Sequence, residues 1–123
     1  MSEYWALMWD VKPGSEETVA KLFEQYGRPD HVVRDEDGNE KGLLVSTQVF
    51  MKGSTVVRVM EIEGATFPEV AAHMGKQPAI RELEEKLDEH LAEPRDMSTP
   101  EGARDFFIKS MMRPVVIRRH DDP

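Results

Sequence analysis

One arginine stands in the middle of the most apolar strand-like stretch of the sequence, Thr55-Val-Val-Arg-Val-Met-Glu-Ile-Glu63. A guanidinium keeps its proton, so burying it costs several kcal/mol unless a partner or a bound anion meets it. Strands that are apolar on both faces usually lie between two layers of structure. Arg58 is therefore expected either to have a structural partner, to reach water at the end of a sheet, or to line a cavity for an anionic or polar ligand.

The composition narrows the range of partners. The chain has 123 residues and a net charge of −8, which disfavours nucleic acid and anionic membranes. It has no cysteine, which excludes disulfides and thiolate metal sites and fits a reducing cytoplasm. The sequence shows no signal peptide and no apolar run near the ~18 residues of a membrane span. We expect one cytoplasmic domain over residues 1–123.

The first third of the sequence predicts a strand and a helix. Residues 4–11 are almost all apolar, which favours a strand that is covered on both faces. Residues 15–26 carry apolar side chains at helical spacing, and Gly27 is well placed to end that helix. Residues 34–42 are predicted to form a charged loop.

A β-hairpin follows this loop. Strands at residues 43–51 and 55–63 are joined by a tight turn that contains a glycine. A two-residue turn would set Thr47 across from Arg58, and a three-residue turn would set Gln48 there. Either side chain could solvate the guanidinium, so the register stays open at this point.

The second half of the sequence predicts three helices and a short strand. Helices are expected at residues 66–74 and 78–91, and another begins at Ser98-Thr-Pro-Glu101 with a hydroxyl cap and a capping-box glutamate. The acidic side of the middle helix, which includes Glu84, is expected to face water. The last strand is predicted at residues 115–117.

These segments follow the order strand, helix, strand, strand, helix and, after an added helix, strand. The order is typical of the βαββαβ or ferredoxin-like arrangement of the α+β class. An antiparallel sheet with helices on one face leaves its other face uncovered. Because the first and third strands have too few polar residues for an open face, we expect two copies to pack sheet against sheet as a dimeric α/β-barrel.

Several well-known motifs are absent from the sequence. There is no glycine-rich dinucleotide fingerprint, no phosphate-binding loop and no Gly-x-Ser-x-Gly nucleophile motif. The four histidines lack the close spacing of metal ligands. Neither a metal ion nor a cofactor is therefore expected.

Isolated polar residues remain as candidates for chemistry. His73 could act as a general base, or it could be a surface or helix-capping residue. Asp30 and His31 could form an acid–base pair at the mouth of a pocket, or they could belong to a plain loop. Tyr26 ends the buried side of the first helix, where its hydroxyl could reach a cavity or its ring could simply pack in the core.

Two tryptophans suggest a binding surface for a planar molecule. Trp5, Leu7 and Trp9 share one face of the first predicted strand. They could form a flat apolar wall for a ligand, or they could belong to the core or to a dimer interface.

Several stretches of the sequence resemble a known family. The most specific stretch is Ser98-Thr-Pro-Glu-Gly-Ala-Arg104. Further similar stretches are residues 11–15, 49–52, 56–59, 73–87, 93–96 and 104–107. Together they span about residues 4–116, and they are similar to the SchA/CurD-like proteins.

This resemblance implies an accessory protein of aromatic polyketide pathways, such as those of spore pigments, with a dimeric α/β-barrel fold. The layout is also similar to that of tetracenomycin-type polyketide cyclases and of cofactor-free monooxygenases of antibiotic biosynthesis. Those cyclases carry a histidine where this sequence has Arg58 and another near Tyr26, so their acid–base chemistry is not carried over. An arginine would instead polarise a carbonyl or hold an enolate.

The leading hypothesis is a cyclase or aromatase that acts on a poly-β-ketone. Arg58 would supply the positive charge, and His73 or His31 would transfer the proton. The residues expected to shape the pocket or bind the substrate are Trp5, Trp9, Tyr26, Asp30 and Gln48.

Two other hypotheses stay open. The first is a cofactor-free oxygenase of anthrone-like substrates, in which the substrate anion itself reacts with oxygen. The second is a non-catalytic binding or scaffold protein that docks a polyketide synthase component.

Overall fold

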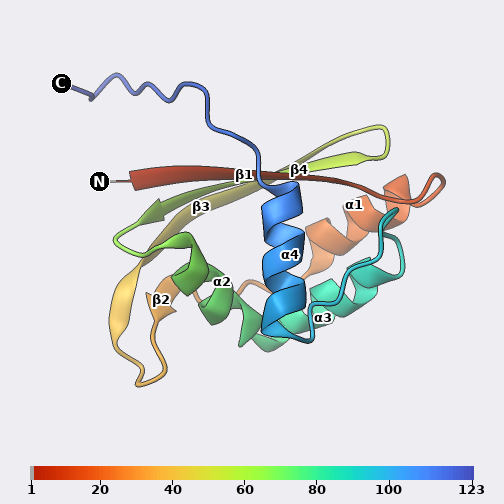
Figure 1. The fold of residues 1–123 in the computed structure, drawn as a ribbon, viewed down its shortest axis with the longest axis horizontal. Helices are drawn as coiled ribbons and strands as arrows, with labels where there is room; N and C mark the ends of the chain where they lie inside the picture. The colour runs from red at the N-terminus through yellow and green to blue at the C-terminus, as the bar shows by residue number, and fades with distance from the viewer. Residues whose placement is uncertain (1) are drawn as a thin grey trace.

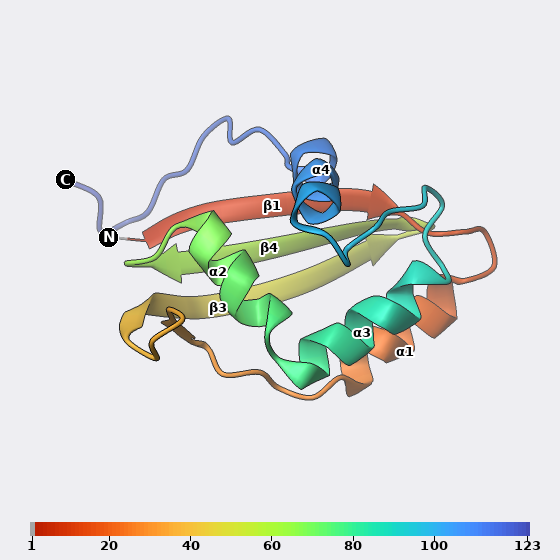
Figure 2. The same cartoon turned by 60° about the horizontal axis from the view of Figure 1, so that its bottom comes forward.

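The computed structural model describes residues 2–123 and contains one four-stranded antiparallel sheet. The strands are β1 (Ser2–Asp10), β2 (Val32–Arg34), β3 (Glu40–Lys52) and β4 (Thr55–Glu63). The helices are α1 (Glu16–Gln25), α2 (Phe67–Gly75), α3 (Pro78–Asp88) and α4 (Pro100–Ser110). All of these helices lie on the same face of the sheet (Figures 1 and 2).

The sheet has the strand order β1-β4-β3-β2. β4 lies between β1 and β3 and is antiparallel to both, so β1 and β3 run in the same direction on either side of it. With α1 as their connection, they form the split βαβ unit. The mixed α+β class is therefore confirmed, and the strand order is consistent with the ferredoxin-like arrangement.

A short strand that was not predicted, β2, ends where the predicted charged loop of residues 34–42 begins, and β3 already starts inside that loop at Glu40. β2 pairs with the beginning of β3, and Val33 on β2 is fully buried. Between the two strands, the carboxylate of Asp35 accepts hydrogen bonds from the N–H groups of Asp37 and Asn39. Gly38 has a φ of +84°, which is the left-handed region that such a turn requires. Charged residues thus form the turn, and a single buried valine anchors the added strand.

Apolar side chains from the sheet and the helices form two buried clusters. Under α2, the core consists of Leu7, Val33, Leu44, Met60, Ile62, Ala65, Phe67 and Val70. Under α1 and α3, it consists of Val11, Val19, Val56, Leu83, Leu87 and Leu91. Within residues 2–123, no helix combines the length and the apolar character that crossing a bilayer demands.

α4 begins with a hydroxyl cap, as predicted, but without the predicted capping box. The side chain of Thr99, and not that of Ser98, accepts the hydrogen bond from the N–H of Gly102. The third helical position is therefore Gly102, so Glu101 cannot complete a capping box. A Cβ atom on Gly102 would lie 1.8 Å from the carbonyl oxygen of Asp96, which shows that the preceding loop packs directly on this turn.

The strand predicted at residues 115–117 is not formed. After α4, the N–H of Met112 donates to the carbonyl of Ala6 at 2.8 Å, which starts an antiparallel pairing with the outer edge of β1. The next hydrogen-bonded pair in this register would need an N–H at position 114, and Pro114 has none. The chain therefore leaves the edge, and Val115 is 81% exposed.

The face of the sheet opposite the helices is apolar and uncovered. Met8, Val57 and Phe50 form a row across β1, β4 and β3. Met8 is 48% exposed and Phe50 is 61% exposed. The expectation that this face lacks a cover within one chain is therefore confirmed, whereas the dimer itself stays a prediction.

Two glycine substitutions test the packing of the loop on α4. We expect Gly102→Ala to lower the free energy of unfolding by about 1–3 kcal/mol, because the added methyl group collides with the Asp96 carbonyl. Gly75→Ala is the control, since a Cβ atom there has nothing within 4 Å. It should stabilise the end of α2 by about 0.5–1 kcal/mol. Urea unfolding measures the free energy of unfolding of both variants. Equal changes in the two variants would contradict the packing of the loop on α4.

Candidate functional site

Arg58 lines a small cavity between the sheet and the helices, which we call the inner cavity. Its volume is about 90 Å³. The guanidinium is half-buried, and Arg58 Nε donates to the hydroxyl of Thr47 at 3.3 Å. No carboxylate of residues 2–123 forms an ion pair with Arg58. The other lining residues are Leu7, Leu44, Met60, Phe67, Val70, Ala71, Met74, Gly75, Ile80, Glu84, Met97 and Phe107. Arg58 therefore brings a positive charge without a carboxylate partner into a largely apolar space.

The hairpin register that delivers Thr47 to Arg58 differs from both predicted registers. Lys52 pairs with Thr55 across a two-residue turn, and counting back from this pair sets Val49 opposite Arg58. Thr47 pairs with Met60 and so lies on the same face of the sheet as Arg58, one diagonal step away. The predicted positions opposite Arg58 were wrong, although Thr47 does solvate the guanidinium.

Gln48 lies on the opposite face of the sheet from Arg58. It pairs with Val59, is exposed, and donates from its side-chain amide to the Ser46 hydroxyl at 3.1 Å. Because side chains alternate along a strand, Gln48 cannot reach the inner cavity without a shift of register. The structure thus does not bring Gln48 together with Arg58.

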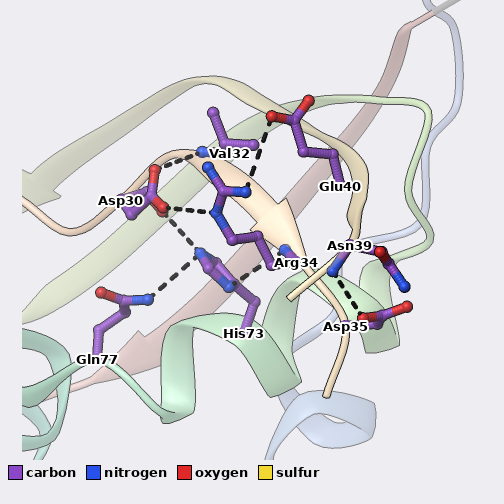
Figure 3. Close-up of polar contacts among 8 residues, drawn as sticks. All are labelled: Asp30, Val32, Arg34, Asp35, Asn39, Glu40, His73 and Gln77. Carbon is purple, nitrogen blue, oxygen red and sulfur yellow. Dashed lines mark hydrogen bonds and ion pairs between the residues drawn. The ribbon is translucent and has the colours of Figure 1, made fainter. Parts of the chain in front are cut away.

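His73 is buried in a network of backbone contacts (Figure 3). Its Nε2 lies 2.9 Å from the carbonyl oxygen of Asp30, and its Nδ1 lies 3.3 Å from the N–H of Arg34. A carbonyl can only accept, so Nε2 carries the proton and Nδ1 accepts. Both ring nitrogens are therefore engaged, and His73 holds the segment before β2 against α2. It does not line the inner cavity.

Asp30 serves the same local network. Its carboxylate accepts from the N–H of Val32 at 3.0 Å and from Nε of Arg34 at 3.3 Å. The hydrogen bond from Val32, together with the one from Arg34, lowers the pKa of the Asp30 carboxyl below its usual value. Asp30 is thus an ionised turn residue at neutral pH, and it lies outside the inner cavity.

His31 has one free ring nitrogen. Its Nδ1 lies 3.1 Å from the carbonyl oxygen of Leu44, so Nδ1 must donate, and Nε2 has no hydrogen-bond partner within residues 2–123. The ring is half-buried, and the side chain of Leu44 lines the inner cavity. Of the two histidines predicted for proton transfer, only His31 has a ring nitrogen that the described residues leave unengaged, and it contacts the cavity wall only through Leu44.

Trp5, Trp9 and Tyr26 belong to one continuous chain of aromatic rings that links β1, α2, α4 and α1. The centroid distances are Trp5–Phe67 5.3 Å, Phe67–Phe107 5.2 Å, Phe107–Phe106 5.7 Å, Phe106–Trp9 5.8 Å, Trp9–Phe23 6.4 Å and Phe23–Tyr26 6.4 Å. Packing holds these rings, because the buried indole N–H groups of both tryptophans lack an acceptor in the described part of the chain. The structure therefore brings these three predicted residues into one aromatic framework.

A second hollow lies beside this framework, and we call it the outer groove. Its volume is about 380 Å³, and it lies between the end of β1, residues 91–95 and α4. Trp9 and Phe106 line it together with Arg95. Tyr26 instead lines a hollow of about 420 Å³ between α1 and β3, where Thr47 is a neighbour.

An ion pair near the inner cavity was not predicted. Arg95 bonds to the carboxylates of Glu84 and Asp88, and its side chain is only 6% exposed. Its guanidinium also lies 4.4 Å from the ring centroid of Phe106, which is a favourable cation–π position. Glu84 was expected to face water, but it is half-buried and lines the inner cavity. The sequence signal was an arginine shortly after an acidic helix, which does not reveal which carboxylate it reaches.

Comparison with known proteins places the chain in a family. The SchA/CurD-like domain family matches residues 2–119. The chain belongs to this family. It is 36% identical to Polyketide synthase CurD of Streptomyces cyaneus over 126 residues, and 36% identical to the 42.8 kDa protein in the whiE locus of Streptomyces coelicolor over 110 residues. It is also 34% identical to Protein SchA of Streptomyces halstedii over 110 residues.

The relatives are much longer than this chain. The matches cover 94%, 89% and 89% of the chain but only 33%, 26% and 27% of CurD, the whiE-locus protein and SchA. The chain thus spans a third or less of the curated relatives that it matches. No solved structure matches it.

No group of three or more histidine, aspartate or glutamate side chains in residues 2–123 is arranged to hold a metal ion.

Replacing His73 tests its structural role. We expect His73→Leu to lower the free energy of unfolding by about 1–3 kcal/mol, because it leaves the Arg34 N–H and the Asp30 carbonyl without their partner. His120→Leu is the control in the exposed C-terminal tail and should change stability by less than about 0.5 kcal/mol. Denaturant unfolding followed by circular dichroism measures both. A His73→Leu protein as stable as the His120→Leu protein would contradict the assignment.

Proposed function

We propose that this chain acts in aromatic polyketide biosynthesis by binding a poly-β-ketone between its sheet and its helices and promoting ring closure. Membership of the SchA/CurD-like family and the similarity to a protein named Polyketide synthase CurD support the substrate class. The observation that carries the proposal is Arg58, whose guanidinium has no carboxylate partner in residues 2–123 and faces an apolar cavity.

The proposed chemistry follows from the acidity of the substrate. A methylene group between two ketones loses a proton easily, and the enolate carbon then attacks another ketone of the same chain. Arg58 would hold the enolate oxygen through charge-assisted hydrogen bonds. Because an arginine does not accept a proton, the base must be another group, and the free Nε2 of His31 is the available choice. The proton returns to the new alkoxide, and loss of water completes the aromatic ring.

A second candidate function is binding without catalysis. Both nitrogens of His73 are engaged by the backbone, and neither His73 nor His31 is among the residues that line the inner cavity with Arg58. A protein that only holds and folds an enolised polyketide, or presents it to a polyketide synthase component, needs the cation and the aromatic framework but no base. The two candidates share the same ligand and differ in whether turnover occurs.

The same proposal includes a homodimer. Met8, Val57 and Phe50 form an apolar row on the uncovered face of the sheet, and large exposed apolar surfaces are uncommon on monomers. A second copy could cover this row by packing sheet against sheet, since both copies would then bury the same residues.

A charged substitution on the open face tests the dimer. We expect Phe50→Glu to shift the protein to a monomer, because a carboxylate would be buried in the apolar interface. Ile108→Glu is the control, since Ile108 is 65% exposed but lies on α4 on the other face of the sheet. Sedimentation equilibrium gives the mass of each. A monomeric unchanged protein would reject the dimer.

Substitution of Arg58 tests the function. We expect Arg58→Met to remain folded and to lose roughly 10²-fold in the rate of ring closure, because the enolate loses its fixed positive charge. The exposed Arg81→Met is the control and should behave as the unchanged protein. The assay supplies a poly-β-ketone from a reconstituted polyketide synthase and measures the cyclised products.

The outcomes separate the candidates. Unchanged products with Arg58→Met would reject the proposed role of the guanidinium. Binding of the polyketide without any faster ring closure would favour the non-catalytic candidate. Oxygen uptake with an anthrone substrate would instead indicate a cofactor-free oxygenase.

A further inference from the structure

The inner cavity is too small for a whole aromatic polyketide. Its volume is about 90 Å³, whereas pockets for drug-sized ligands usually measure roughly 300–1,000 Å³. The outer groove, with about 380 Å³, lies within that range but lacks Arg58. The cation and the room for a ring system are therefore in two different hollows.

No residue lines both hollows, but residues that line one are direct neighbours of residues that line the other, and these neighbours form a wall between them. On β1, Leu7 lines the inner cavity and Trp9, two residues later on the same face, lines the outer groove. On α4, the adjacent residues Phe107 and Phe106 line the inner cavity and the outer groove, respectively.

The third component of the wall is the ion pair between Glu84 and Arg95. Glu84 lines the inner cavity, Arg95 lines the outer groove, and the two side chains bond to each other. Arg95 also keeps a second carboxylate, that of Asp88, at 2.8 Å. The charge of Arg95 would therefore stay compensated if Glu84 moved away. This part of the wall can thus open without leaving a buried cation unpaired.

The helix that carries the aromatic part of the wall has little fully buried surface. Among the residues of α4, only Ser110 is buried, and Ile108 is 65% exposed. The segment before α4, residues 93–98, has no helix or strand structure. Figure 2 shows α4 crossing over β1 at some distance from the side-by-side pair of α1 and α3. A small displacement of α4 thus costs few buried contacts.

The charges around the outer groove determine how a ligand would be oriented. Lys109 at its rim is paired with Glu93 and Asp105, and Arg95 is paired as described. Asp10, which also lines the groove, adds a further negative charge. The groove therefore disfavours an anion, whereas the inner cavity offers the uncompensated cation of Arg58.

We propose that the inner cavity and the outer groove form one elongated site for an aromatic anion. The anionic end binds Arg58, the ring system lies against Trp9 and Phe106, and the Glu84–Arg95 pair is a partition that parts when the ligand enters. This inference rests on the proposed role of Arg58 as an anion site and adds the ligand's length, its orientation and the route by which it reaches the guanidinium.

Binding of anthracene-2-carboxylate tests the proposal. This probe has three fused rings in a line and a carboxylate at one end, and energy transfer from the two tryptophans reports its binding. We expect one probe per chain, with an affinity that falls about tenfold or more in Arg58→Met and in Ala92→Phe. Ala92 is an exposed residue of the outer groove, so the added ring occupies the groove without disturbing the core.

Two controls accompany these variants. Ala72→Phe adds the same ring at an exposed position of α2 outside the two hollows and should leave the affinity unchanged. Benzoate, which is short enough for the inner cavity alone, should bind more weakly to Arg58→Met but equally well to Ala92→Phe.

The outcomes distinguish this inference from the proposed function. If Arg58→Met weakens binding of the three-ring probe and Ala92→Phe does not, the elongated site is rejected while the anion site at Arg58 stands. If Ala92→Phe weakens binding and Arg58→Met does not, the probe lies in the groove alone. This result rejects both the elongated site and the anion site at Arg58. If neither variant changes the affinity, the elongated site and the anion site are again both rejected.

A further variant tests the partition itself. Glu84→Gln removes the charge that faces the inner cavity and weakens the bond to Arg95, which keeps Asp88 as its partner. We expect the probe to associate severalfold faster, as measured by stopped-flow fluorescence. An unchanged association rate would show that the pair does not control access to Arg58.

Discussion

The candidate site depends on one positive charge that residues 2–123 leave without a carboxylate partner. The sequence has 24 acidic and only 16 basic side chains, so carboxylates are abundant. Nevertheless the guanidinium of Arg58 meets only the hydroxyl of Thr47 within residues 2–123. The nearby Glu84 bonds to Arg95 instead, and Glu61 on the same strand as Arg58 bonds to Arg119. An arginine that stays unpaired amid such an excess of acid is more readily explained by a ligand than by stability.

The aromatic framework explains why this charge can be kept away from bulk water. The ring chain from Trp5 through Phe67, Phe107 and Phe106 to Trp9 connects β1 to α2 and α4 along the cavity wall. Aromatic pairs of this kind add stability beyond the area that they bury. α4 contributes two of the five rings although it is otherwise little buried. Two of the rings along the cavity wall are thus carried by a helix in which only Ser110 is buried.

The sequence predicted what depends on local pattern and missed what depends on long-range geometry. Apolar runs located the three long strands but left open whether Arg58 meets a partner, water or a cavity, and counting from an assumed turn gave the wrong register for Thr47. The strand predicted at residues 115–117 does not form, because Pro114 lacks the N–H that would make the next hydrogen bond to β1. The unperturbed pKa of histidine lies near neutrality, so the sequence suggested His73 as a base. Only the fold reveals that both of its ring nitrogens bond to the backbone. The pairing of Arg95 across the α3–α4 loop leaves no periodic signal.

The combination of a fixed cation with little acid–base machinery restricts the reactions that this site can serve. A substrate with weakly acidic protons would need a strong, well-placed base beside Arg58, and His31 adjoins the cavity only through Leu44. A poly-β-ketone needs less, because its methylene groups are already acidic and its ring closures compete mainly with one another. For such a substrate, holding one enolate at Arg58 and the rest of the chain along an aromatic wall determines which carbons meet. The arrangement therefore favours control over the site of ring closure rather than acceleration of a difficult proton transfer.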